Sequence, residues 1–319
     1  MSDYGFRDRL SAAFPSQVII DVTEVCNLAC IHCPHPEFKK SEHYAARYLD
    51  AALVHKAVDE IATHGAQYVR FTSEGEPLIH PGIYDMLQYA VEKSGTFVTL
   101  TTNGTTMNEK RVQRLIQSGL HMVDVSIDAF HKKTYDKIRI DGNFRAVERN
   151  VELLLNMARG TKTQVVVSFI KQDLNANEDE LFRLFWEHAG ATVVIRNLHS
   201  AAGAVVPVAN ILRDGQARQE RRPCVYPWER IVLNPRGYLA FCPADWTHGS
   251  SMVDYRTTTI KDTWQNKFYA ALRKAHLCNN YKRHSFCGQC PDWAVTRWPG
   301  EGRAYADLVS EKSEKKATL

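Results

Sequence analysis

The stretch that decides the fold is QVIIDVTEVCNLACIHC, residues 17–33. Its first part is rich in apolar and β-branched residues, which predicts a strand over residues 18–22. Three cysteines follow at once, with three residues between Cys26 and Cys30 and two between Cys30 and Cys33. Closely spaced cysteines in a loop after a strand are typical of a metal centre. We therefore predict such a centre at the carboxyl end of the first strand.

The same kind of strand recurs five more times, each time separated from the next by helical periodicity. Strands are predicted at residues 18–22, 68–72, 96–101, 122–127, 164–170 and 192–196, and helices at 50–64, 82–93, 108–118, 143–158 and 178–189. Asn108 and Asn177 are predicted N-caps, and glycines stand where the helices should end. Six repeats predict an α/β fold, a partial (β/α)6 TIM-like barrel that stays open, with its active site at the carboxyl ends of the strands.

The pattern changes after His199, and this change sets the predicted domain limits. Residues 1–16 form an N-terminal extension, 17–200 the barrel and 201–222 a linker or cover loop rich in arginine. Residues 223–298 hold five of the eight cysteines and five of the six tryptophans, which predicts a small C-terminal domain organised by metal. The charged residues 299–319 are predicted to be a tail.

Composition excludes several classes of protein. The 319 residues are 44% hydrophobic and 24% charged, as in an ordinary globular protein, and the formal net charge of +4 does not predict nucleic-acid binding. No apolar run is long enough for a bilayer, and residues 1–10 do not form a signal peptide. We therefore expect a cytoplasmic protein without a membrane partner, in which the cysteines bind metal or react rather than form disulfides.

The first three cysteines have a specific chemical meaning. Three thiolates, from Cys26, Cys30 and Cys33, leave one iron of a [4Fe-4S] cluster without a protein ligand. That open iron can bind S-adenosylmethionine (SAM), and reduction then allows a carbon–sulfur bond of SAM to be cleaved. The alternative is a zinc site that takes His32 or His35 as its fourth ligand. Electron transfer of the ferredoxin type would need a fourth cysteine nearby.

Further motifs make the barrel part resemble the radical SAM superfamily. Glu74-Gly75-Glu76-Pro77 resembles the family's GGEP turn, with Glu74 in place of the first glycine. The segments after the third and fourth strands, Thr102-Asn103-Gly104 and Ser126-Ile127-Asp128, resemble SAM-contacting segments, and residues 135–139 resemble a helix whose arginine pairs with the SAM carboxylate. The resemblance implies a SAM site made by Glu74, Gly75, Glu76, Pro77, Asn103, Ser126, Asp128 and Arg139, to which we add Arg196.

The remaining cysteines resemble the shortened SPASM domain called Twitch. Its pattern here is Cys224, Gly237, Cys242 and the Cys287–Cys290 pair. The resemblance implies one auxiliary [4Fe-4S] cluster with four cysteine ligands and no open iron, which could exchange an electron with the substrate. A structural four-cysteine zinc site is the alternative. Cys278 is left over as a buried cysteine, an alternative ligand or a catalytic thiol.

Chain size and the auxiliary-cluster spacing are similar to those of an aminocyclitol dehydrogenase and of aminoglycoside epimerases within this family, and no leader-peptide module is seen before Gln17. We therefore expect hydrogen abstraction from a carbinol carbon of a small polar substrate: a sugar, a cyclitol or a nucleoside-like compound. Arg196, His199, Asp245 and Glu229 are predicted near it. Dehydrogenation needs a general base, Asp245 or His199, whereas epimerisation needs a thiol such as Cys278. The external electron donor would be a flavodoxin or ferredoxin.

Two other functions stay open at this point. One is a maturase that modifies a peptide or protein side chain, which would need an open groove instead of a pocket enclosed by residues 200–222. The other is a non-catalytic binding module stabilised by zinc, which would bind no SAM.

Overall fold

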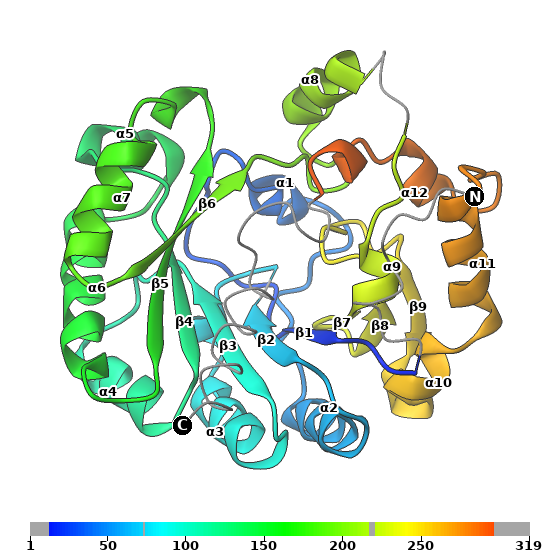
Figure 1. The fold of residues 1–319 in the computed structure, drawn as a ribbon, viewed down its shortest axis with the longest axis horizontal. Helices are drawn as coiled ribbons and strands as arrows, with labels where there is room; N and C mark the ends of the chain where they lie inside the picture. Colours follow the sequence, from blue (N-terminus) through cyan, green and yellow to red (C-terminus); the bar gives the residue numbers. More distant parts are fainter. Residues whose placement is uncertain (1–12, 73, 217–220, 297–319) are drawn as a thin grey trace, which may run out of the picture.

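A computed structural model describes residues 13–72, 74–216 and 221–296 (Figure 1). Most of the predicted N-terminal extension and all of the predicted tail lie outside the described residues. The predicted domain limits therefore stay predictions, and the fold is described below by its elements. No helix within the described ranges is long and apolar enough to cross a membrane.

All six predicted strands are present, and they form one parallel sheet in chain order. They are β1 (Gln17–Asp21), β2 (Tyr68–Thr72), β3 (Phe97–Thr102), β4 (Met122–Ser126), β5 (Gln164–Lys171) and β6 (Thr192–Asn197). In the sheet of described strands, β6 lies at one edge and β9 at the other, so the barrel is open as predicted.

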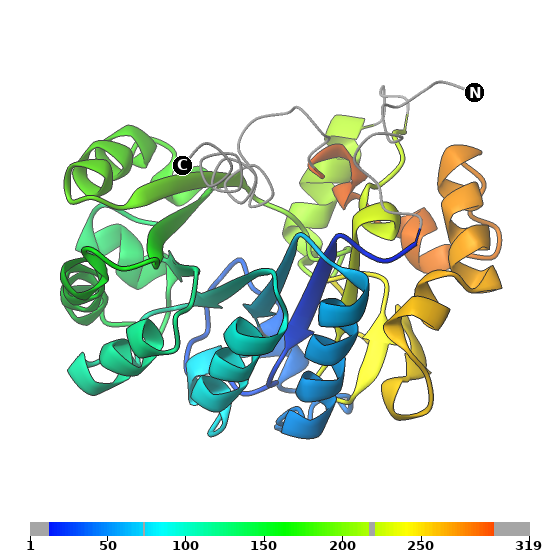
Figure 2. The same ribbon diagram turned by 60° about the horizontal axis from the view of Figure 1, so that its bottom comes forward.

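The five predicted helices are also present: α2 (Ala51–His64), α3 (Ile83–Lys93), α4 (Glu109–Gln117), α6 (Phe144–Ala158) and α7 (Asp179–His188). Figure 2 shows helices along the outer face of the curved sheet. Each is amphipathic and buries one apolar face, as α2 does with Leu53, Val54 and Ile61. The predicted cap Asn108 accepts a hydrogen bond from the Arg111 N–H at 3.0 Å.

The predicted cap Asn177 is wrong, because α7 begins one residue later. Its N-cap is Glu178, and the Glu178 side chain makes no capping hydrogen bond. Its carboxylate instead accepts from the N–H groups of Phe130 and His131, at 2.8 and 3.1 Å. A tertiary contact with the segment leading into α5 (Lys132–Ile138) thus takes the place of a local cap.

The stretch predicted as a linker or cover loop contains a helix, α8 (Val206–Gln216). Its alanine, glycine and proline content did not predict this helix. Pro207 stands in the first turn, where the N–H group it lacks has no partner in the helix. A short helix, α1 (His35–Phe38), also follows the first cysteine loop.

The cysteine-rich part continues the barrel sheet. Strand β7 (Arg230–Leu233) pairs in parallel with β1, and β8 (Tyr238–Ala240) and β9 (Ser251–Asp254) add antiparallel strands, so the order is β6-β5-β4-β3-β2-β1-β7-β8-β9. Gly237 makes the β7–β8 turn at a φ of +80°, which accounts for a glycine there. The helices of this part are α9 (Tyr226–Glu229), α10 (Ile260–Trp264), α11 (Lys267–Leu277) and α12 (Ser285–Gln289).

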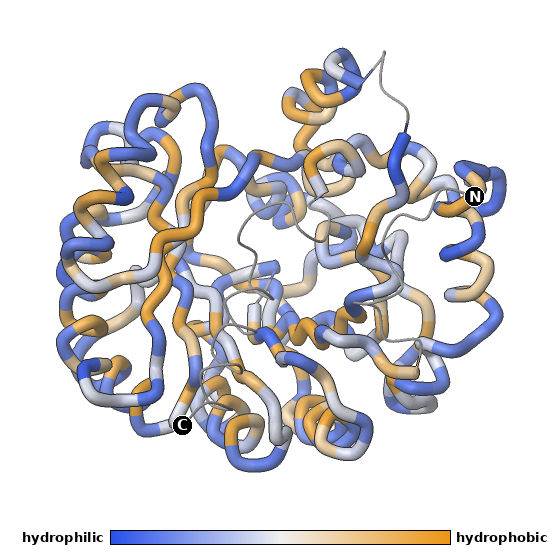
Figure 3. Tube along the Cα trace, viewed as in Figure 1, coloured by the Kyte–Doolittle hydropathy of each residue, from blue (hydrophilic) through white to orange (hydrophobic). Residues whose placement is uncertain are grey.

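Successive side chains of each strand point alternately outward, toward the helices, and inward, toward the inside of the barrel. Outward side chains such as Val18, Ile20 and Phe71 pack with the helices in the main core, and full burial of each contributes roughly 1.5–3 kcal/mol. Figure 3 shows the hydrophobic strands and the more polar outer turns. Inward side chains make a small apolar cluster of Tyr68, Met122, Val166 and Val194. The inward positions that come next along the strands are polar, and they contribute to the site.

Candidate active site

The first cysteine loop lies between β1 and α1, at the carboxyl end of β1. Cys30 is buried, and Cys26 and Cys33 are half-buried. The segment after α5 holds the loop in place, because the Ala29 N–H donates to the Ile140 carbonyl at 3.0 Å. Burial raises the pKa of Cys26 to about 11 and that of Cys33 to about 12. Three thiols whose desolvation opposes ionisation are suited to a cationic partner such as iron, which stabilises thiolates.

Arg139 and Asp128 form a buried ion pair beside this loop. The Arg139 Nε donates to Asp128 Oδ2 at 2.9 Å, and its Nη1 lies 3.6 Å from the Cys30 Sγ. The other Asp128 oxygen accepts from the Ile170 N–H at 2.7 Å. Asp128 takes up a left-handed backbone with a φ of +65°. The predicted SAM contacts Asp128 and Arg139 thus contact each other, and Arg139 reaches the cysteine loop.

The turn Glu74-Gly75-Glu76-Pro77 packs directly against the cysteine loop. A Cβ on Gly75 would lie 2.1 Å from the Val25 carbonyl oxygen, so only glycine fits. The buried Glu76 carboxylate accepts from the Asn103 N–H at 2.7 Å and from the Thr102 hydroxyl at 2.5 Å. These hydrogen bonds join the turn after β2 to the end of β3, and the Glu76 N–H, which donates to the Val25 carbonyl at 2.8 Å, joins that turn to the segment leading into the cysteine loop.

Asn103 extends this connection. Its side-chain amide donates to Asn27 Oδ1, within the cysteine loop, at 3.0 Å. Ser126 lies half-buried at the end of β4, with Ser168 of β5 as its Cα partner in the register. Most of the predicted SAM residues thus stand at the carboxyl ends of β2, β3 and β4; Arg139 lies at the C-cap of α5 and Arg196 within β6.

Sequence reasoning singled out Arg196 but missed the polar side chains around it inside the barrel, and we call the whole set the interior polar layer. The Arg196 Nη2 donates to Asp124 Oδ2 at 2.7 Å and to the Ser168 hydroxyl oxygen at 3.2 Å. Burial raises the pKa of Asp21 to about 7, although the charge of Arg70 acts in the opposite direction. The signal was present as polar residues at alternate positions of apolar strands. The layer consists of Asp21, Arg70, Thr101, Asp124, Ser168 and Arg196.

The three remaining residues predicted near the substrate have different surroundings. His199 follows β6 and is exposed; its Nδ1 accepts from the Ala201 N–H at 3.1 Å, and desolvation lowers its pKa. Asp245 is occupied locally, because its carboxylate accepts from the N–H groups of Thr247 and Ser250 at 2.9 and 2.6 Å. Glu229 forms an ion pair with Arg230.

The second set of cysteines comes together from three segments. Burial raises the pKa of Cys224 to about 11 and that of Cys290 to about 12, and neighbouring thiols of the set raise the pKa values of Cys242 and Cys287 further. Cys278 is exposed at the C-cap of α11, a helix that lies at the outer edge of the molecule in Figure 1. The structure therefore groups Cys224, Cys242, Cys287 and Cys290 and leaves Cys278 apart.

A cavity of about 330 Å³ adjoins this second set, next to α8. It is lined by Arg213, Arg221, Cys290 and Trp293 among others. It lies on the side of the molecule where a pocket covered by residues 200–222 was expected, and its use for substrate stays a prediction.

Family models match both parts of the chain. The model of the radical SAM superfamily matches residues 20–175, and the SPASM model, an iron–sulfur cluster-binding domain, matches residues 224–291. Together the two matches cover more than half of the chain.

Curated relatives include enzymes named GTP 3′,8-cyclase. A probable GTP 3′,8-cyclase of Methanococcus maripaludis (strain C5 / ATCC BAA-1333) is 29% identical over 159 residues, 50% of this chain and 51% of that protein. The chain thus spans about half the length of the first of these relatives. The GTP 3′,8-cyclase of Vibrio vulnificus (strain CMCP6) is 26% identical over 308 residues, 84% of this chain and 89% of that protein.

Solved structures share the fold. BtrN in complex with AdoMet and 2-DOIA has a TM-score of 0.61 at 19% identity, over 88% of this chain and 95% of BtrN. Streptococcus suis SuiB bound to the precursor peptide SuiA has a TM-score of 0.67 at 14% identity, over 94% of this chain and 74% of SuiB. The family matches also confirm the predicted cofactor classes, SAM and [4Fe-4S] iron–sulfur clusters. The chain belongs to the radical SAM superfamily and carries a SPASM domain.

Proposed function

We propose that this radical SAM enzyme abstracts a hydrogen atom from a carbinol carbon of a small polar substrate, a sugar, an aminocyclitol or a nucleoside-like compound, and that it dehydrogenates that carbon. The observation that carries the proposal is the interior polar layer. It offers donors and acceptors inside the barrel, at the depth where the strands turn toward the cysteine loop.

The cofactor roles follow from the residues already described. Cys26, Cys30 and Cys33 would hold the SAM cluster, and Cys224, Cys242, Cys287 and Cys290 the auxiliary cluster. When bound and reduced by an external donor such as flavodoxin or ferredoxin, the first cluster with SAM supplies a 5′-deoxyadenosyl radical, and the second supplies an electron acceptor. Arg139, at 3.6 Å from Cys30 Sγ, would donate a charge-assisted hydrogen bond to the ligated sulfur.

The charge of the interior polar layer selects among substrates. Its two guanidinium groups are opposed by carboxylates, since Arg196 contacts Asp124 and Arg70 acts on Asp21. A triphosphate needs several cations that are not already neutralised. A neutral or aminated polyol instead needs mixed donors and acceptors, which this layer provides. These charges favour a small polyol over a nucleoside triphosphate.

Dehydrogenation requires a place for one proton and one electron after the hydrogen atom has left. The hydroxyl proton would pass to a base in the layer, for which Asp21, with a pKa of about 7, is suited. The two bases expected from sequence are both engaged locally: the Asp245 carboxylate accepts from the Thr247 and Ser250 N–H groups, and His199 Nδ1 accepts from the Ala201 N–H at 3.1 Å, which leaves His199 Nε2 as a second candidate. The exposed position of Cys278 weighs against its use as the hydrogen donor of an epimerase.

Reaction of the reconstituted enzyme with aminocyclitols deuterated at carbinol carbons tests this function. We expect deuterium in 5′-deoxyadenosine and a product that is two hydrogens lighter than the substrate. An inverted product in which a solvent hydrogen has replaced the abstracted deuterium, with no second hydrogen lost, would show epimerisation, and a Cys278→Ala variant would then lose inversion.

A second candidate is favoured by the similarity to GTP 3′,8-cyclase over 84% of the chain. GTP is therefore assayed in parallel, and its conversion, with no turnover of polyols, would replace the proposal. Turnover of peptides alone would favour the maturase alternative.

A further inference from the structure

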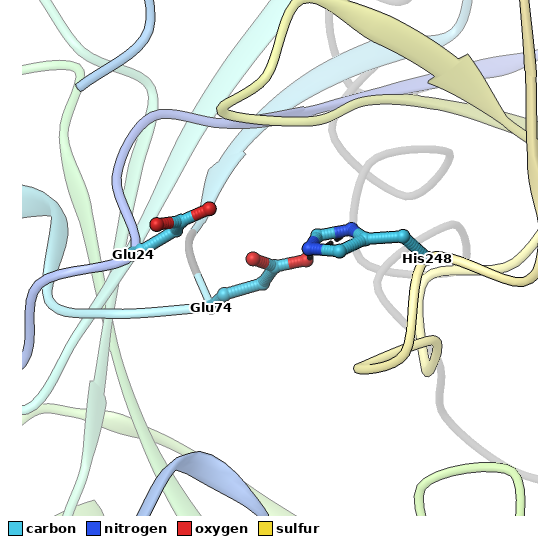
Figure 4. Close-up of side chains that lie close together, drawn as sticks. All are labelled: Glu24, Glu74 and His248. Atoms are coloured by element: carbon cyan, nitrogen blue, oxygen red, sulfur yellow. Dashed lines mark ion pairs between the residues drawn. The ribbon is translucent and has the colours of Figure 1, made fainter. Parts of the chain in front are cut away.

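Three ligating side chains outside both cysteine sets converge on one buried point. They are Glu24, which follows β1, Glu74, which follows β2, and His248, in the loop between β8 and β9 (Figure 4). One potential ligand atom of each lies within 4.8 Å of the others. The exposed fractions are 0% for Glu24, 7% for Glu74 and 4% for the His248 side chain.

Two polar atoms at this point have no partner. Glu74 Oε2 and His248 Nε2 are buried and make no hydrogen bond within the described part of the chain. Glu74 Oε1 and His248 Nδ1 are 3.9 Å apart, which is too far for a hydrogen bond. A buried polar group without a hydrogen-bond partner destabilises the fold, so such a cluster calls for a ligand.

The electrostatics indicate a cation. Burial, together with the charges of Asp21 and Glu24, raises the pKa of Glu74 well above its usual range. Glu24 is fixed by an ion pair with Arg47 at 2.6 Å, and its other oxygen accepts from the Ala45 N–H at 2.9 Å. Carboxylate oxygens retain further lone pairs for an ion. Because Arg47 already balances the charge of Glu24, Glu74 is the carboxylate whose charge a bound cation would offset.

The spacing agrees with this assignment. Ligands at about 2.0–2.2 Å from a common ion lie roughly 3–4.4 Å from one another. The 3.9 Å between Glu74 and His248 falls in that range, so only a small adjustment is needed. Oxygen and imidazole donors without thiolate suit manganese, iron or zinc in the divalent state.

We propose that Glu24, Glu74 and His248 bind a divalent transition-metal ion at a site separate from both cysteine sets. The site joins the loop that leads to Cys26, the turn after β2 and the loop that follows Cys242. A bound ion would thus fix the barrel's cysteine loop relative to the auxiliary part. Glu74 stands where the GGEP turn has glycine, and the ion gives this carboxylate a function.

Mn²⁺ is the suitable probe, because it prefers oxygen and imidazole ligands and competes weakly for thiolates. The full-length protein is reconstituted anaerobically with both clusters, equilibrated with Mn²⁺ and desalted, and manganese and iron per chain are measured together. We expect one Mn²⁺ per wild-type chain and at least a tenfold weaker affinity in Glu74→Gln and in His248→Gln, with iron unchanged. His55→Gln, a half-buried histidine on α2, serves as the matched control and should retain Mn²⁺.

Wild-type protein with full iron and no bound Mn²⁺ would overturn the proposal, as would retention of Mn²⁺ by both variants. Thermal unfolding gives a second readout: Mn²⁺ should raise the Tm of the wild type and of His55→Gln. If Glu74→Gln or His248→Gln also loses iron, the Mn²⁺ affinity of the other variant, which is altered on a different loop, tests the proposal. These readouts do not depend on substrate turnover, so they stand or fall separately from the proposed function.

Discussion

The protonation of the buried Asp21 carboxylate makes the stability of the protein depend on pH. In the folded protein its pKa is about 7, against an ordinary value of 3.8, because burial disfavours its charge. Between about pH 4 and pH 7 the unfolded chain releases this proton while the folded chain keeps it. The free energy of unfolding therefore falls as the pH rises through that window.

Replacement of Asp21 by Asn should remove this dependence. At pH 8 the variant should be more stable than the wild type, by an amount on the order of a few kcal/mol, and near pH 4 the difference should be small. Denaturant unfolding at both pH values measures it. A variant-minus-wild-type difference that is the same at pH 4 and pH 8 would show that Asp21 is not buried as described.

The buried ion pair of Arg139 and Asp128 should contribute both to the stability of the fold and to iron binding by the first cysteine set. Arg139→Gln leaves a buried carboxylate without its counter-charge, which should destabilise the fold by about 3–5 kcal/mol and lower the iron retained by the first cysteine set. Arg139→Lys should restore the charge but not the two-pronged contact, and should recover only part of the loss. Urea unfolding and iron content measure both effects. Arg145→Gln, in an exposed ion pair on α6, is the control and should change stability by less than about 1 kcal/mol.

The cysteines and motif residues of the candidate site could be predicted from the sequence, because each motif consists of residues a few positions apart in the chain. It did not allow the interior polar layer or the Glu24–Glu74–His248 cluster to be predicted. Glu74 and His248 are far apart in the chain, and only the pairing of β7 with β1 brings their loops together. Such contacts depend on register and topology, which local patterns do not encode.

Among the elements, strands and helices were predicted well wherever periodicity and caps agree. The bounds of β2, Tyr68–Thr72, match the predicted residues 68–72, because a buried strand and its flanking turn signals are local. Two predictions failed. The cap of α7 was misplaced because Glu178 makes a tertiary contact with the segment leading into α5, and α8 was missed because its composition is that of a loop.

The turn after β2 is the element most sensitive to added volume. Gly75→Ala would place a Cβ 2.1 Å from the Val25 carbonyl oxygen, and backbone on both sides must move. We expect at least tenfold weaker SAM binding, measured by equilibrium dialysis, together with a loss of iron from the first set. Gly215→Ala in α8 is the matched control: its Cβ meets nothing within 4 Å, and the change should be neutral or stabilising by about 0.5–1 kcal/mol. Equal SAM affinity in the two variants would contradict the close packing.

The whole molecule is held together by one continuous sheet and by contacts to α2. Besides the pairing of β1 with β7, the Lys56 ammonium on α2 donates to the carbonyls of Tyr255 and Thr258 at 2.7 and 2.6 Å. Sequence patterns predicted a small metal-organised domain, but not the strands β7, β8 and β9 that continue the barrel sheet into it. Both cysteine sets are therefore positioned by the same sheet. We expect each set to keep its place when the other set holds no metal.

That framework leads to the prediction that decides the cofactor assignment. In a variant with Cys26, Cys30 and Cys33 all changed to Ala, anaerobic reconstitution should yield about half the iron of the wild type, roughly four atoms per chain, because the four thiols of the second set lie on other segments. Iron, sulfide and zinc are counted in both proteins. If the variant instead retained zinc and no iron, the second set would be a structural zinc site. Dehydrogenation would then lack its electron acceptor, and epimerisation, which needs no net electron loss, would become the better assignment.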